Sequence, residues 1–136
     1  MPIDIYWADD AHTIIIIQPI GKWTWDAFYE ASTESYQMMD NSSGSHKIHT
    51  ILDWSKNATF PKDSLMHGRN ILNNRRHPRQ GTVVLAGMNR VTNALFEGFM
   101  QLGGKTLKKF DAMTARTVEE ALQKLAELPQ TDPLSS

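Results

Sequence analysis

The stretch that decides the fold class is TIIIIQPI, residues Thr13–Ile20, which Gly21 ends. β-branched side chains favour extended backbone, so this stretch predicts a strand. Its four consecutive isoleucines show no alternation of apolar and polar residues, which indicates a strand covered on both faces, as in parallel sheets. Upstream, Ile3–Trp7 alternates weakly and predicts an edge strand, joined to the next strand by a turn at Asp9–His12.

Predicted helices and strands alternate along the rest of the chain. Thr24 marks one helix start as an N-cap, Pro61 marks another as a first helical residue, and Thr117 forms a capping box with Glu120. Helices are predicted at about 24–39, 61–74, 89–102 and 117–125, and further strands at 47–54, 82–86 and 110–114. The order β-β-α-β-α-β-α-β-α predicts a single-domain α/β fold over residues 1–128, with a mainly parallel five-stranded sheet, one antiparallel edge strand and about four helices. Residues 129–136 are predicted as a flexible tail.

Composition excludes several functional classes. The 136 residues contain 14 Lys and Arg against 15 Asp and Glu, and this balance argues against a nucleic-acid partner. The absence of Cys excludes disulfides, thiolate catalysis and zinc sites of the cysteine type. The longest aliphatic run, Ile14–Ile17, is far shorter than the roughly 20 residues of a membrane span, and no basic signal region precedes it. We therefore expect a cytoplasmic domain without a membrane span.

The order of elements and the chain length resemble the STAS or SpoIIAA-like family of bacterial anti-sigma-factor antagonists over nearly the whole chain. Ile51–Ser55 is similar to the family's apolar strand that ends in Asp-x-Ser, and Lys62–Leu65 is similar to the Asp-Ser that opens the following helix. Residues 21–26, GKWTWD, are similar to an uncharacterised bacterial subgroup. The resemblance implies that Ser64 accepts phosphate from a partner kinase, although Leu65 and Met66 follow it in place of a hydroxyl residue and Gly.

The function that the resemblance implies is a non-enzymatic regulatory domain that binds a protein partner, such as a kinase or another anti-sigma-like regulator. The candidate partner-binding residues are Asp53, Ser55, Asp63, Ser64 and His67. A separate physical argument supports Ser64, because free amides and the positive dipole end near a first helical turn stabilise a phosphate. The simpler alternative is an ordinary serine that satisfies backbone amides at a helix start.

A second function, a small-molecule or lipid carrier, follows from the predicted carboxyl edge of the sheet. Trp23, Trp54 and Met88 follow predicted strands and are candidates for an apolar ligand pocket, with Asn89 as a polar contact. Ligands of open parallel sheets usually bind at this edge. The alternative is that the tryptophans close the core and that Asp53 caps the loop after its strand.

No catalytic constellation, metal site or cofactor motif emerges from the sequence. His46 and His49 are three apart on a predicted strand and point to opposite faces, so they do not share a metal. Ser64 and His67 lack an oxyanion hole, and no Gly-rich phosphate loop is present. We therefore expect no enzyme activity, no metal and no cofactor. One basic cluster is predicted to be a solvated helix end, and it comprises Arg69, Arg75, Arg76, His77 and Arg79.

A homodimer is expected from the apolar second strand. If all helices crowd one face of the sheet, as the resemblance suggests, the other face needs cover from loops, tryptophans or a second copy. The predicted helix at 61–74 is further expected to carry a surface hydrogen bond or weak ion pair between Asp63 and His67, which are four residues apart.

Overall fold

The computed structural model describes residues 3–63, 66–67, 77–90, 93–94, 97 and 112–128. These residues form a five-stranded sheet with the strand order β1-β2-β3-β4-β5. The strands are β1 (Ile3–Trp7), β2 (Ile14–Pro19), β3 (Ile48–Asp53), β4 (Gln80–Ala86) and β5 (Ala112–Ala115). β1 pairs with β2 in antiparallel orientation, and the other three neighbouring pairs are parallel. The predicted α/β class and the mixed sheet with one antiparallel edge strand are confirmed.

Two helices lie among the described residues, α1 (Trp25–Asn41) and α5 (Val118–Ala126). Both begin where the sequence predicts, because Thr24 Oγ1 accepts a hydrogen bond from the amide of Ala27 and Thr117 Oγ1 accepts one from the amide of Glu120. The other two predicted helices, at 61–74 and 89–102, fall mostly outside the described residues, as does the predicted tail at 129–136. The predicted helix start at Pro61 is wrong, because residues 61–63 are not helical and Asp63 has a left-handed φ of 62°. In the described part of the chain, neither helix has both the length and the apolar composition that crossing a membrane requires.

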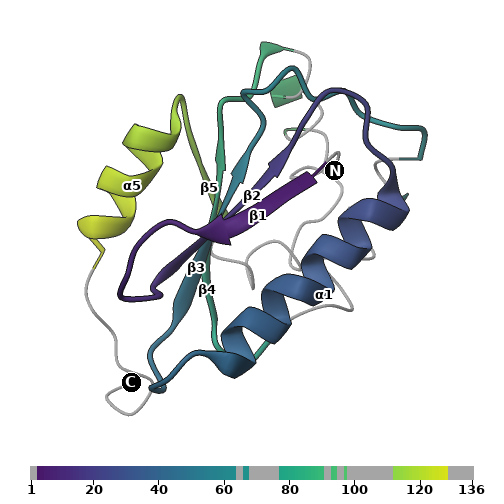
Figure 1. The fold of residues 1–136 in the computed structure, drawn as a ribbon. Coiled ribbons are helices and arrows are strands. Elements are labelled where there is room, and N and C mark those ends of the chain that lie inside the picture. The colour runs from purple at the N-terminus through teal and green to yellow at the C-terminus, as the bar shows by residue number, and fades with distance from the viewer. Residues whose placement is uncertain are drawn as a thin grey trace.

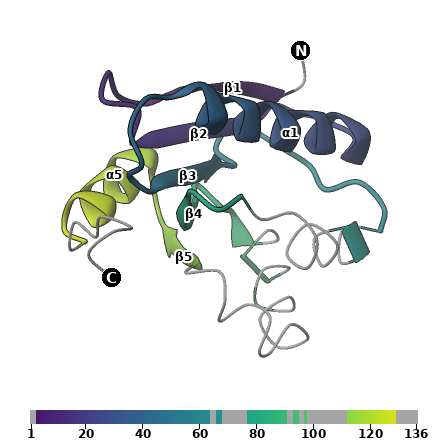
Figure 2. The same ribbon diagram turned by 90° about the horizontal axis from the view of Figure 1, so that it is seen from below.

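The two helices cover opposite faces of the sheet (Figure 1 and Figure 2). Ile15 and Ile17 belong to the core cluster that α1 closes. Ile16 belongs to a second cluster, which includes Ala121 and Leu125 of α5. The run of isoleucines therefore forms a strand buried on both faces, as its lack of alternation predicts.

The position of α5 changes the argument for a dimer. This helix packs against β3, β4 and β5 on the face opposite α1, so the helices do not all crowd one face. We expected a homodimer because we assumed that all helices lie on one face and leave the other uncovered. That assumption is wrong, because α5 covers part of the second face. The dimer itself stays a prediction, which sedimentation of the purified chain tests.

The start of β4 holds the end of α1. Arg79 donates hydrogen bonds from Nη1 to the carbonyl oxygens of Met39, at 2.7 Å, and Ser42, at 3.0 Å. Its Nε donates to the carbonyl oxygen of His46 at 3.1 Å. The prediction that the basic cluster is a solvated helix end is therefore wrong for Arg79, which is half-buried and donates to carbonyl oxygens at and just after the end of α1. Other members of the cluster, Arg69, Arg75 and Arg76, lie outside the described residues.

Candidate functional site: the carboxyl edge of the sheet

Residues Trp54–Asp63, here called the edge loop, follow β3 and are bonded to the chain that follows β2. The amide of Gly21 donates to the carbonyl oxygen of Lys56 at 3.1 Å, and the amide of Thr59 donates to the carbonyl oxygen of Gly21 at 2.9 Å. Ile20 and Lys56 also form an isolated parallel bridge. The edge loop is therefore tied to the main sheet along its first half.

Asp53, a predicted partner-binding residue, is inside the protein. Its side chain is only 3% exposed, and its carboxylate accepts hydrogen bonds from Gln18 Nε2 at 2.7 Å and from the amide of Ser55 at 2.9 Å. The carboxylate therefore fixes the start of the edge loop. This is the alternative given in the sequence analysis, in which Asp53 caps the loop after its strand. Burial, and then the negative charges of Asp53 and Asp4, raise the pKa of the neighbouring Tyr6.

The tryptophans at this edge pack into an aromatic cluster. Trp23 contacts Trp25 edge-to-face with ring centroids 4.7 Å apart, and lies 5.9 Å from Trp54. Phe60 of the edge loop stacks obliquely on Trp54 at 4.8 Å. Trp23 and Trp54 are 4% and 6% exposed, so both side chains contribute to the core. The indole Nε1 atoms of Trp23, Trp25 and Trp54 are nevertheless buried with no hydrogen-bond acceptor in the described part of the protein.

The exposed partner-binding candidates lie at the two ends of the edge loop. Ser55 and Asp63 are both exposed, and Asp63 has a φ of 62°. His67 is half-buried and differs from its prediction, because its Nδ1 lies 2.8 Å from Tyr29 Oη and shares a hydrogen bond with it. Its ring also stacks on Trp25 at 5.2 Å, and only its backbone amide bonds to the carbonyl oxygen of Asp63. Ser64 lies outside the described residues.

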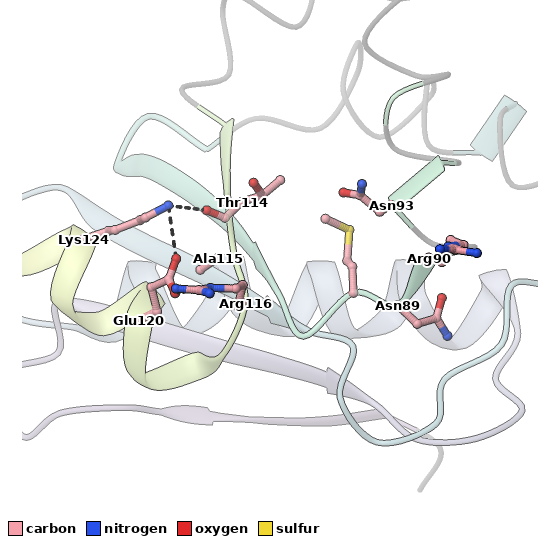
Figure 3. A pocket seen from close by; sticks show the side chains of 9 residues that line it. Asn89, Arg90, Asn93, Thr114, Ala115, Arg116, Glu120 and Lys124 are labelled. Carbon is pink, nitrogen blue, oxygen red and sulfur yellow. Dashed lines mark hydrogen bonds and ion pairs between the residues drawn. The ribbon is translucent and has the colours of Figure 1, made fainter.

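A pocket of about 450 Å³ lies at the carboxyl ends of β4 and β5 (Figure 3). Of the four ligand-pocket candidates, Met88 and Asn89 line it, whereas Trp23 and Trp54 do not. The full lining consists of residues that follow β4, the end of β5 and the first turns of α5: Met88, Asn89, Arg90, Asn93, Thr114, Ala115, Arg116, Glu120 and Lys124.

One carboxylate organises the cations on the α5 side of this pocket. Glu120 Oε2 accepts a hydrogen bond from Arg116 Nε at 3.2 Å, and Glu120 Oε1 lies 3.5 Å from Lys124 Nζ. Lys124 Nζ also donates to the carbonyl oxygen of Thr114 at 2.7 Å. The hydrogen bond from Arg116, helped by the charges of both cations and the bond from Lys124, lowers the pKa of Glu120. Glu120 is therefore a carboxylate at neutral pH.

Sequence reasoning missed Arg90, Arg116 and Lys124 as site residues. Arg90 and Arg116 come a few residues after two of the predicted strands, where the carboxyl-edge argument applies. Their positions just after strands could therefore have identified both as candidate site residues. The sequence offers no such indication for Lys124, because this residue reaches the pocket only through the packing of α5.

The histidines are used separately. His46 Nε2 donates to the carbonyl oxygen of His12 at 3.0 Å, while His49 Nδ1 accepts from the amide of Thr82 at 2.9 Å. Within the described ranges, no group of three or more His, Cys, Asp or Glu side chains is arranged to hold a metal ion.

With the geometry of this edge established, the sequence was compared with known proteins. No model of a known protein family matches the chain. A search of proteins with curated descriptions finds no match either. The functional conclusions therefore rest on the residues themselves and on the resemblance to the antagonist family.

Proposed function

We propose that this chain is a cytoplasmic, non-enzymatic regulatory domain of the STAS or SpoIIAA-like type that binds a protein partner through the edge loop and the residues just after it. One observation carries the proposal: the backbone of the loop is bonded to Gly21 while most of its polar side chains are exposed. The exposed residues are Ser55, Lys56, Asn57, Thr59, Lys62 and Asp63.

The order of the loop favours binding on energetic grounds. A partner that docks on a loop already held in place does not have to offset the entropy of ordering it. Trp54 and Ala58 are buried and anchor the loop from below, so the exposed side chains project from a fixed backbone. The loop therefore offers a polar surface with a defined shape.

Phosphorylation of Ser64 would reverse the charge of this surface. The exposed ionisable groups of the edge loop are Lys56, Lys62 and Asp63, which together carry a net charge of about +1 at neutral pH. A phosphate adds about −1.5 to −2 charges, which brings the sum to about −0.5 to −1. An acidic partner surface would then bind the unmodified form and release the phosphorylated form, with a kinase as the second partner.

The test compares full-length chains with substitutions at Ser64. Ser64→Ala and Ser64→Asp, each immobilised, are exposed to lysate of the native host, and recovered proteins are quantified and mapped for phosphorylation. We expect a partner that Ser64→Ala retains and Ser64→Asp loses by about tenfold or more, with phosphate found on Ser64 of the native protein.

Matched substitutions at Ser45, which is exposed in the turn after α1, serve as controls and should recover the same proteins as the wild type. Equal recovery by both Ser64 variants would refute the switch.

A second candidate function, a carrier of a small apolar molecule or lipid, is favoured by three buried indole N–H groups that have no acceptor among the described residues. An unpaired buried donor costs about 1–3 kcal/mol, and a ligand oxygen inserted among Trp23, Trp25 and Trp54 would remove that cost. Native mass spectrometry of the purified chain tests this function. A co-purifying mass that is reduced by Trp54→Phe supports a carrier, and the mass of the bare chain alone refutes it.

A further inference from the structure

The pocket between β4, β5 and α5 is not used by the proposed function and has the position of a ligand site. It lies where the parallel strands β4 and β5 end, which is the usual binding position in open α/β sheets. Its volume of about 450 Å³ falls within the range of small-molecule sites, about 300 to 1,000 Å³. The pocket therefore has the place and the size to take a small organic molecule.

The strand ends beside the pocket are held together by close contacts at Gly87, the residue that follows β4. Gly87 turns the chain out of β4 with a φ of 73°, and a Cβ at this position would lie 2.8 Å from Ser55 Cβ. The amide of Gly87 donates to the carbonyl oxygen of Ala115 at 3.3 Å, which joins the end of β4 to the end of β5. The ends of β4 and β5 are therefore already joined, and binding does not require them to be brought together.

The pocket is positively charged in a chain that is slightly negative. Arg90, Arg116 and Lys124 line it against the single carboxylate of Glu120, which leaves a formal charge of about +2, whereas the whole chain carries −1. Arg90 lies on one side of the pocket, and Glu120 and Lys124 lie on the other (Figure 3). A ligand between the two sides meets cations from both.

Several guanidinium donors of this pocket have no hydrogen-bond partner among the described residues. The bond from Arg116 to Glu120 uses only Nε, and the Arg116 side chain is 91% exposed. Among the described residues no group pairs with the Arg90 guanidinium or with Arg116 Nη1 and Nη2. Guanidinium groups bind phosphates and other oxyanions through two parallel N–H···O bonds.

We propose that this pocket binds a small, soluble organic molecule through a doubly charged oxyanion, of which a phosphate ester is the ordinary biological form. Arg90 and Arg116 donate paired hydrogen bonds to the oxyanion from opposite sides, and Lys124 adds positive charge. A dianion neutralises the net charge of the pocket, whereas a monocarboxylate leaves about one positive charge uncompensated. The volume beyond the oxyanion accommodates the organic part.

The experiment titrates the full-length, ¹⁵N-labelled chain with glycerol 3-phosphate at constant ionic strength. We expect saturable amide shifts at Gly87–Arg90 and Arg116–Lys124, and a dissociation constant that Arg90→Ala and Arg116→Ala each raise by about tenfold or more. Lys22→Ala, which removes an exposed cation outside the pocket and the edge loop, should leave the constant unchanged. Glu120→Gln should tighten binding, because it removes the one negative charge that lines the pocket.

Four outcomes would overturn the proposal. Shifts that do not saturate, or a loss with Lys22→Ala equal to that with Arg90→Ala, would show general attraction of anions. Binding of acetate as tight as that of glycerol 3-phosphate would contradict the requirement for a dianion. A response to phosphatidic acid vesicles without one to glycerol 3-phosphate would assign the site to a lipid headgroup.

Discussion

Arg79 Nη1 lies 2.7 Å from the carbonyl oxygen of Met39, a residue 40 positions earlier in the chain. The last carbonyls of a helix have no partner within the helix, and the macrodipole makes this end negative. α1 has no basic residue in its own last turn, so the start of β4 supplies the missing cation. The guanidinium therefore joins two elements that the sequence keeps far apart.

We expect Arg79→Ala to lower the free energy of unfolding by about 1.5–3 kcal/mol, the usual worth of hydrogen bonds to a charged group. Arg79→Lys should recover only a small part, because an ammonium group does not reach the carbonyl oxygens of Met39, Ser42 and His46 together. Urea denaturation measures both. Lys56→Ala, an exposed control, should change stability by less than about 0.5 kcal/mol, and an equal loss there would contradict the capping role.

A comparison of two glycines distinguishes the cost of backbone strain from the cost of a steric clash. Gly21 and Gly87 both have a positive φ, but a Cβ on Gly21 meets nothing within 4 Å, whereas one on Gly87 lies 2.8 Å from Ser55 Cβ. We expect Gly21→Ala to cost about 1 kcal/mol and Gly87→Ala to cost at least about 1 kcal/mol more. Thermal unfolding of the two variants provides the comparison, and equal costs would show that the loop at Ser55 moves aside freely.

The unpaired indole N–H groups make a prediction about Trp54. Trp54→Ala should cost about 3–5 kcal/mol, as for other large buried side chains. Trp54→Phe should cost less than about 2 kcal/mol, because the loss of packing is offset by removal of an unsatisfied donor. Urea denaturation of the two variants measures both losses of unfolding free energy. If Trp54→Phe lowers the unfolding free energy as much as Trp54→Ala does, the Nε1 atom of Trp54 has a hydrogen-bond partner in solution.

The features that the sequence predicted correctly are set by neighbouring residues. Four consecutive isoleucines place apolar side chains on both faces of a strand, which implies that both faces are covered. Accordingly, Ile15 and Ile16 belong to different core clusters. Thr24 and Thr117 bond to amides three residues ahead, which is within the reach of a local pattern. Local sequence therefore predicted the strand type of β2 and the starts of α1 and α5.

The features that were missed join residues distant in the sequence. His67 pairs with Tyr29, 38 positions away, rather than with Asp63 on its own turn, because the edge loop brings it back over α1. The cations of the pocket come from the ends of two strands and from α5, and only the strand order brings them together. Periodicity locates a residue on a face, but it does not identify the side chain that packs opposite.

The burial of His49 by residues distant in the sequence gives the protein a pH dependence. Its Nδ1 accepts the amide hydrogen of Thr82, and the chain passes so close that a Cβ on Gly81 would lie 2.5 Å from that nitrogen. Burial lowers the pKa of His49 from its ordinary value of 6.5, because a charged imidazolium loses hydration there. Protonation of Nδ1 would also remove the acceptor that Thr82 uses. The folded protein therefore holds this side chain neutral.

The unfolded chain takes up a proton on His49 near pH 6.5, while the folded chain does so only at lower pH. The stability that neutral His49 contributes is therefore complete above about pH 6.5 and is lost as the pH falls toward the folded-state pKa. His49→Asn keeps an acceptor for the Thr82 amide but does not titrate, and the other histidines remain in both proteins. The unfolding free energy of the wild type relative to this variant should accordingly decrease between pH 7.5 and pH 5.5 in urea titrations. A difference that stays constant over that interval would mean that His49 has the same proton affinity folded and unfolded.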